Sequence, residues 1–285
     1  MRLGRLGDRG DEIPVALDGE RVLDLRSVVP DLDAAALMPD SLDRIRAALA
    51  AGALPELPDA ATRRRGAPVA RPGSVFCIGM NYAAHIAESG GTPAEMPVLF
   101  LKTPATVGGP DDPVEIPRGS VRTDWEVELG VVIGSRALYL ASPAESRSRI
   151  AGFVAANDLS ERDWQLRDSG GQWSKGKIAP GFSPLGPWLV TTDELDPGDL
   201  RLRSWVNGEP RQDSRTSDML FDVDHLVWHL SQYTVLEPGD VILTGTPEGV
   251  ALSGRFPYLA AGDVVEIEIE GLGRQRQEFR NGEQR

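Results

Sequence analysis

Two glutamates separated by one residue stand in segment 123–134, which reads Thr-Asp-Trp-Glu-Val-Glu-Leu-Gly-Val-Val-Ile-Gly. Alternate side chains of a β-strand point to the same side, so a strand here places Glu126 and Glu128 together. Two carboxylates on a mostly apolar strand repel each other and are costly to desolvate unless something neutralises them. The pair therefore indicates a bound divalent cation. The alternative is a solvated strand face that carries two acids.

A third carboxylate could complete this set. Asp158 follows the apolar segment 150–156 and Asn157, and it precedes a candidate helix that it could instead cap. With Glu126 and Glu128 it would supply three oxygen ligands, a set that suits a hard ion. We predict Mg²⁺ at this site, with Mn²⁺ or Ca²⁺ as the alternatives.

An imidazole and a carboxylate are paired earlier in the chain. His85 and Glu88 are three residues apart in segment 81–89, which is expected to form a short helix, so they would lie side by side. A carboxylate beside an imidazole raises its basicity and fixes its tautomer, as a general base for water requires. The alternative is an exposed pair on the surface of the helix.

Two glycine-containing segments could surround an anionic ligand. Segment 162–177 mixes hydrogen-bonding side chains with tryptophans and glycines and ends in lysines. In segment 243–250, free backbone amides near Gly245 and the hydroxyl of Thr246 could hold a carboxylate. The alternatives are an unconstrained surface loop for the first segment and a simple turn for the second.

The elements that must position these side chains are mostly β-strands. After residue 70 the apolar runs predict strands at 74–78, 97–102, 125–133, 151–157, 186–191, 200–206, 240–244 and 263–270. Helices are expected at 81–89, 143–149, 160–168 and 222–235. Because strands follow strands without regular helical crossovers, the pattern predicts a β-rich α+β domain rather than a doubly wound α/β fold.

The first 70 residues are expected to form a small α+β domain of their own, with 71–285 as the main domain. Segment 13–25 alternates around Asp18-Gly19, which is typical of a hairpin, and segment 42–51 is typical of a short helix. The proline-rich stretch around Arg63-Arg64-Arg65 is predicted to be a solvated linker. A phosphate contact by the three arginines is the alternative.

Composition limits the partners. A formal net charge of −13 argues against nucleic acid, although a local site could still attract a small anionic substrate. No apolar run approaches the roughly 20 residues that span a bilayer, and the N-terminus lacks a signal-peptide pattern, so we expect a cytoplasmic protein without a membrane partner. The single cysteine, Cys77, excludes an intrachain disulfide.

The ordered series of motifs resembles the fumarylacetoacetate hydrolase family over residues 72–271. The matching stretches are Gly79-Met80-Asn81-Tyr82 with His85 and Glu88, then Phe100-Leu101-Lys102, segment 124–129, Asn157-Asp158, Lys177, Gly186-Pro187, Asn207-Gly208 and segment 243–247. This resemblance implies a mixed β-sandwich roll as the catalytic fold, usually dimeric, with a magnesium or manganese ion. The first 70 residues resemble the less uniform N-terminal domain that many members carry.

The resemblance also implies roles for single residues. The metal ligands of the family match Glu126, Glu128 and Asp158. Its water-activating pair matches His85 and Glu88. The positions that face the substrate or its enolate match Arg162, Gln165 and Lys177, and the carboxylate-binding turn matches Gly245 and Thr246.

Members of the family split or isomerise 2-oxo acids, and segments 160–162, 170–177 and 184–190 look like the 2,4-diketo-3-deoxy-sugar-acid hydrolases. We therefore predict hydrolysis of an acylpyruvate or a diketo sugar acid to pyruvate and a carboxylic acid by a homodimer. The alternatives are decarboxylation of oxaloacetate, isomerisation of an unsaturated diacid, and a binding protein that senses a 2-oxo acid without turnover. Pro180 stands where many relatives have Asp, which leaves the exact reaction open.

Overall fold

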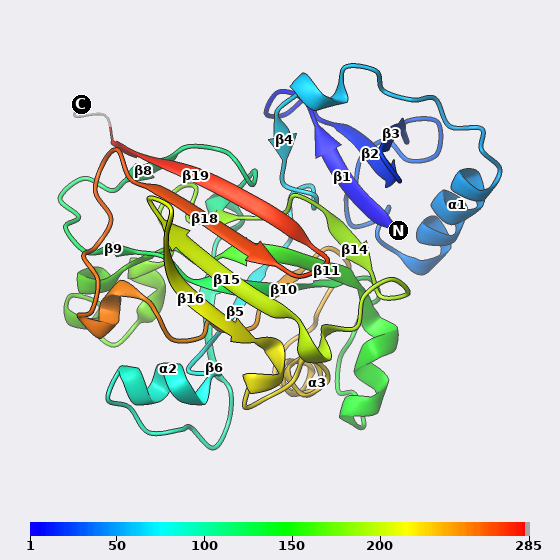
Figure 1. Cartoon of the computed structure of the whole chain (residues 1–285). Helices are drawn as coiled ribbons and strands as arrows, with labels where there is room; N and C mark the ends of the chain where they lie inside the picture. Colours follow the sequence, from blue (N-terminus) through cyan, green and yellow to red (C-terminus); the bar gives the residue numbers. More distant parts are fainter. Residues whose placement is uncertain (283–285) are drawn as a thin grey trace.

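Two β-sheets packed face to face form the centre of the molecule in this computed structural model, which describes residues 1–282 (Figure 1). The strands of the larger sheet are, in spatial order, β3 (Arg21–Asp24), β2 (Ile13–Asp18), β1 (Arg2–Leu6), β14 (Leu189–Thr191), β11 (Ile150–Asn157), β10 (Val127–Ile133), β17 (Val241–Leu243), β5 (Val75–Gly79) and β6 (Val98–Lys102), with β4 (Arg65–Gly66) paired to β1. Those of the smaller sheet are β16 (Glu209–Arg215), β15 (Arg201–Val206), β18 (Val264–Ile269), β19 (Gly273–Asn281) and β8 (Val114–Ile116).

The remaining elements are short. Two strand pairs stand apart from the sheets: β9 (Thr123–Asp124) with β12 (Ser160–Glu161), and β7 (Val107–Gly108) with β13 (Ser183–Pro184). The α-helices are α1 (Pro39–Ala50), α2 (Ala83–Glu88) and α3 (Val223–Ser231). No helix in the described part of the chain has the length and apolar character needed to cross a bilayer.

The central strands β10 and β11 are buried along their whole length and separate two apolar cores. Val131 of β10 packs in the core between the two sheets, and its neighbour Val132 packs in the core on the opposite face. Residues of the first 70, which we call the N-terminal unit, close the second core. They include Leu25 and, on α1, Ile45. This alternation follows from the two-residue period of a strand. A strand that is buried on both faces requires nearly continuous apolar residues.

The β-rich α+β class is confirmed, and each predicted strand has a counterpart in the structure. The helix predicted at 160–168 is present but shorter and of another type: the chain forms β12 first and then a single π-helical turn, Asp163–Arg167. The predicted helix 143–149 is a 3₁₀ helix, and the helix predicted at 222–235 ends at Ser231.

Strand β19 was not predicted because its inward face carries two glutamines. Gln275 and Gln277 are both fully buried, and their amides donate to backbone carbonyls, among them that of Ala155 at 2.8 Å. A buried polar group is tolerated when it is hydrogen-bonded, so a core strand can look polar in the sequence.

The prediction of a solvated linker around the three arginines is also wrong. Strand β4 pairs with β1, and the Arg64 guanidinium donates to Asp112 at 2.6 Å and to Glu12 at 3.0 Å. These contacts join the N-terminal unit to the rest of the chain. Because β1 also pairs with β14 in the larger sheet, the division into two domains at residue 70 remains a prediction.

Candidate active site

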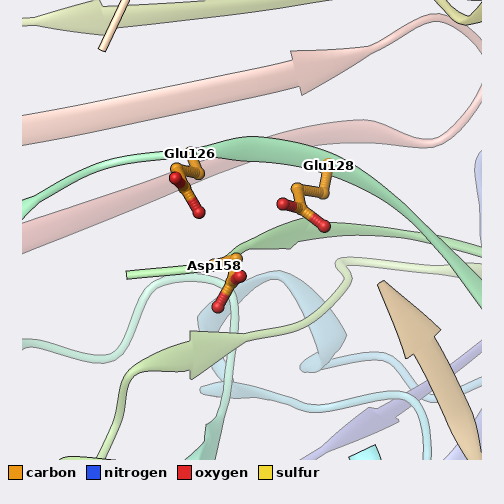
Figure 2. Close-up of side chains that lie close together, drawn as sticks. All are labelled: Glu126, Glu128 and Asp158. Carbon is orange, nitrogen blue, oxygen red and sulfur yellow. The ribbon is translucent and has the colours of Figure 1, made fainter. Parts of the chain in front are cut away.

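The pairing of β10 with β11 brings three carboxylates together. Val127 lies opposite Asn157, so the next pair outward sets Glu126 beside Asp158, and the Asp158 amide donates to the Glu126 carbonyl at 2.9 Å. Glu128 lies diagonally across on the same face. One carboxylate oxygen of each residue lies within 4.8 Å of the others, and Figure 2 shows the three side chains close together.

Two buried lysines contact this acidic triad, which is the name we give to Glu126, Glu128 and Asp158. The Lys177 ammonium donates to Glu126 at 2.5 Å and to Asp158 at 2.7 Å. The Lys102 ammonium donates to the other Asp158 oxygen at 2.5 Å and to the carbonyl of Phe182 at 2.6 Å. Asp158 is therefore compensated on both of its oxygens.

Arg162 is a further buried cation that contacts the acidic triad, through Glu126. Its guanidinium donates to Glu126 at 2.8 Å, to Asp124 at 2.8 Å and to the Gln165 side chain at 2.9 Å. Asp124 in turn accepts from the backbone amides of Ala251 and Leu252. Burial alone would raise the pKa of the Glu126 carboxyl, but the charges of Lys177 and Arg162 hold it well below its usual range.

Glu128 is the member of the triad without a salt bridge among the described residues. It accepts one backbone N–H, from Gly245, at 2.9 Å. Burial and then the charges of Asp158 and Glu126 raise the pKa of this carboxyl well above its usual value. The protein thus carries a buried acid that needs a further positive charge to ionise.

The charges of the site fit a divalent cation. Among the described residues, the buried acids of the triad and of its ion-pair network are Asp124, Glu126, Glu128 and Asp158, and the buried cations that contact them are Lys102, Arg162 and Lys177. When Glu128 is ionised, four negative charges face three positive ones. Three carboxylate oxygens, without a cysteine or histidine among them, are the donors that Mg²⁺ and Mn²⁺ accept. The triad residues are therefore suited to hold such an ion.

The predicted pair of His85 and Glu88 lies on α2 at the side of the same cavity. The nearest ring nitrogen of His85, Nδ1, is 3.8 Å from Glu88, which is beyond hydrogen-bond range, and it has no other partner in the described chain. Glu88 is anchored by the Gly249 amide at 3.0 Å and by Arg255. Burial raises the pKa of the Glu88 carboxyl, but interactions with His85, Gly249 and Arg255 lower it overall.

A cavity of about 570 Å³ connects these groups. Every predicted site residue lines it except Gly245; those are His85, Glu88, Glu126, Glu128, Asp158, Arg162, Gln165, Lys177 and Thr246. The turn was expected to offer a free amide and hydroxyl to a substrate carboxylate. Instead the Gly245 amide is bound to Glu128, and the Thr246 hydroxyl donates to the Val127 carbonyl at 2.9 Å.

Lys102 and Asp124 were missed as site residues, although both lie in stretches that carry the resemblance. In β6 the apolar Leu99 and Leu101 are exposed while the charged Lys102 is buried. The burial of these three side chains is therefore opposite to what their hydrophobicity suggests. Asp124 directly precedes Trp125-Glu126 and is fully buried. For Asp124 the available signal was its place two residues before Glu126, whereas Lys102 has no charged neighbour in the sequence that could have revealed its role.

The chain matches a known protein family over most of its length. The model of the family described as fumarylacetoacetate (FAA) hydrolase C-terminal matches residues 74–280. A Burkholderia ambifaria protein that carries only a provisional hydrolase name is 46% identical over 286 residues, which are 99% of this chain and 99% of that protein.

Solved structures with the same fold include both hydrolases and isomerases. Fumarylacetoacetate hydrolase from Exiguobacterium antarcticum is 33% identical with a TM-score of 0.85, over 99% of this chain and 100% of that one. The 5-carboxymethyl-2-hydroxymuconate delta-isomerase from Mycobacterium smegmatis is 35% identical with a TM-score of 0.78, over 100% of both chains. Maleylpyruvate hydrolase from Sphingobium sp. SYK-6, in complex with manganese(II) and pyruvate, is 26% identical with a TM-score of 0.80, over 99% of this chain and 100% of that one. From the family match, the identities and the shared fold, this chain belongs to the fumarylacetoacetate hydrolase family.

Proposed function

We propose that this protein hydrolyses the C–C bond of a 2,4-diketo acid. Water and R–CO–CH₂–CO–COO⁻ give the acid R–COOH and pyruvate. The observation that carries the proposal is the convergence of the acidic triad, Lys177 and His85 on one cavity. Such a cavity can bind the charged end of a 2-oxo acid and also present a base to water.

Glu126, Glu128 and Asp158 would hold a divalent ion, with Mg²⁺ as our first choice and Mn²⁺ as the alternative. When bound, such an ion polarises the 2-oxo group of a substrate and stabilises the negative charge that develops on its oxygen. The charge count supports this ligand set. A net charge of −1 on the buried groups, a divalent ion and a substrate monoanion together give a neutral site.

Lys177 and Arg162 orient the charged groups of the site. The Lys177 ammonium is held between Glu126 and Asp158, so it is positioned to donate a hydrogen bond to an enolate oxygen that forms beside them. Arg162 binds Glu126 and Gln165, and thereby keeps both side chains in the lining of the cavity.

His85 is proposed to take the proton from the attacking water. The hydroxide adds to the 4-oxo carbon, the C3–C4 bond breaks, and its electron pair passes to the pyruvate enolate, which is protonated at C3. Glu88, 3.8 Å from Nδ1, stabilises the imidazolium that forms. Because Gly249 and Arg255 hold the Glu88 carboxylate in place, Glu88 can orient the imidazolium from a fixed position.

Isomerisation of an unsaturated 2-hydroxy acid is the second candidate. Isomerase-named structures at 35% and 33% identity favour it. The same triad could stabilise the dienol without an attacking water, so His85 distinguishes the two reactions.

The test is a coupled assay of pyruvate release from acetylpyruvate in the presence of Mg²⁺ or Mn²⁺. We expect hydrolysis by the wild type and a loss of about 10²-fold or more in kcat for His85→Ala, as for removal of a general base. Absence of pyruvate from any acylpyruvate, together with consumption of a dienol diacid, would instead establish the isomerase. Tyr233→Ala, an exposed aromatic change on the segment that follows α3, is the control.

A further inference from the structure

We infer, on the basis of the proposed function, that the group R of the substrate is uncharged and apolar. The cavity is polar around the acidic triad, and the rest of its lining among the described residues includes six apolar side chains beside Ser89 and Ser253. They are Ile78, Met80, Phe100, Leu166, Trp173 and Leu252. The division between a charged end and an apolar end carries the inference.

These six side chains, which we call the apolar wall, begin beside Lys177 and extend toward the exposed Leu166. The Lys177 ammonium lies 5.1 Å from the ring centre of Phe100, and this ring lies 5.8 Å from that of Trp173. Phe100 is 6% exposed and Leu166, on the π-helical turn, is 47% exposed. The wall therefore runs from the buried triad to the opening of the cavity, along the path that the group R must take.

The position of the Trp173 indole depends on the absence of a side chain at Gly79, which the ring covers. A Cβ atom on Gly79 would lie 2.4 Å from the Trp173 ring, so a larger side chain cannot occupy that position without moving the indole. Gly79 ends β5 and also lines the cavity. The flat indole face is thus built into the cavity, where it offers contact area to an aliphatic or aromatic group.

Cations are confined to the other end. Among the residues that the structure describes, two cationic residues line the cavity, Arg162 and Lys177, and each is bound to two carboxylates of the protein. Arg255, at the neighbouring rim, is paired with Glu88. A second carboxylate on the substrate would lose hydration at the apolar wall without gaining a free cation. A dicarboxylate is consequently disfavoured against a monoacid of the same shape.

A pair of uncleavable ligands tests this preference independently of turnover. 2-Oxoadipate and 6-methyl-2-oxoheptanoate share the 2-oxo acid end, and an isopropyl group replaces the distal carboxylate in the second. We expect the Mn²⁺-loaded wild type to bind the isopropyl compound with a Kd lower by at least about tenfold in calorimetry. Equal binding, or tighter binding of 2-oxoadipate, overturns the inference whether or not the protein turns over any acylpyruvate.

A cleavable pair links the preference to the proposed reaction. We expect kcat/KM for 4-methylpentanoylpyruvate to exceed that for succinylpyruvate by at least about tenfold. Pyruvate from both at equal rates overturns the apolar preference and leaves the hydrolase proposal intact. No pyruvate from either overturns the hydrolase proposal, and the binding comparison then decides the inference.

Leu166→Arg supplies the cation that the wall lacks, at a position that is 47% exposed. We expect it to shift the ratio of the two kcat/KM values toward succinylpyruvate by at least about tenfold. Val121→Arg adds the same charge at an exposed position outside the cavity lining and should leave the ratio unchanged. An equal shift in both variants would mean that net charge, rather than the wall, controls the preference.

Discussion

The Lys177 ammonium lies 2.5 Å from Glu126, and both side chains are almost completely buried. A buried charge without its partner costs several kcal/mol, whereas the intact pair contributes little net stability. The lysine therefore matters most when no other cation is present at the triad. This relationship makes the stability of the protein dependent on the charge in the site.

We expect Lys177→Met to destabilise the metal-free protein by about 3–5 kcal/mol in chemical unfolding, because Glu126 and Asp158 each lose a buried partner. Mn²⁺ should restore more stability to this variant than it adds to the wild type, since the ion replaces the missing positive charge. Lys175→Met, a change two residues away on an exposed side chain, is the control and should have no effect beyond about 0.5 kcal/mol. A Lys177→Met protein as stable as the control would refute the role of the ion pair.

Glu128 should behave in the opposite way. Because its pKa is raised by burial and by the neighbouring carboxylates, its ionised form destabilises the metal-free fold. Glu128→Gln is therefore expected to unfold at higher denaturant concentration than the wild type at pH 7 in the presence of a chelator. The same variant should lose the stabilisation that Mn²⁺ gives to the wild type, because a ligand is missing.

The pH dependence of this difference has a definite sign. An unfolded Glu has its ordinary pKa of 4.5, and the folded pKa of Glu128 lies higher. The advantage of Glu128→Gln should therefore be absent below about pH 4.5, grow as pH rises above it, and become constant beyond the folded pKa. Unfolding curves with and without a chelator from pH 4 to 8 check this; an advantage largest at low pH would contradict it.

Part of this site could be read from the sequence. The two-residue period of a strand requires Glu126 and Glu128 to share a side, and this holds wherever the strand lies. The approach of Asp158 depends instead on β10 and β11 pairing in one register, with Val127 opposite Asn157. Register is set by which faces are buried and by the connection 134–149, so it is a property of the whole fold.

Other parts could not be read because the decisive contacts are distant in sequence. Lys102 looked like the end of an ordinary strand, since nothing near it in the chain shows that Asp158 would be its partner, 56 residues away. The prediction of a free backbone amide at Gly245 was wrong for a similar reason. Its partner, Glu128, is 117 residues away, and the hydrogen bond exists only after the sheet has assembled.

Arg162 should act as a positioning residue, since its guanidinium bridges Asp124 and Glu126. Arg162→Lys keeps the charge but cannot donate to both carboxylates in the same fixed geometry. We expect Mn²⁺ affinity to fall about 10–100-fold, as for other residues that orient metal ligands, with the fold retained. Arg122→Lys, which alters a partly exposed ion pair with Asp163, is the matched control. Unchanged Mn²⁺ binding by Arg162→Lys in calorimetry would exclude this role.

The contact between Arg64 and Asp112 should hold the N-terminal unit against the rest of the chain. Burial raises the pKa of Asp112, but hydrogen bonds from Arg64 and the Gly109 amide lower it overall, below its usual 3.8. A depressed folded pKa means that the ionised carboxylate stabilises the fold above about pH 3.8, and that this contribution is lost as pH falls through the folded value. Asp112→Asn is therefore expected to cost about 1–2 kcal/mol at pH 7 and progressively less below pH 4, measured by denaturant unfolding. Asp111→Asn removes the more exposed partner of Arg65 and should cost less than about 1 kcal/mol at either pH. If the two variants lose the same stability at pH 7, the contact is an ordinary surface pair, and the N-terminal unit is held by β1 and its apolar core alone.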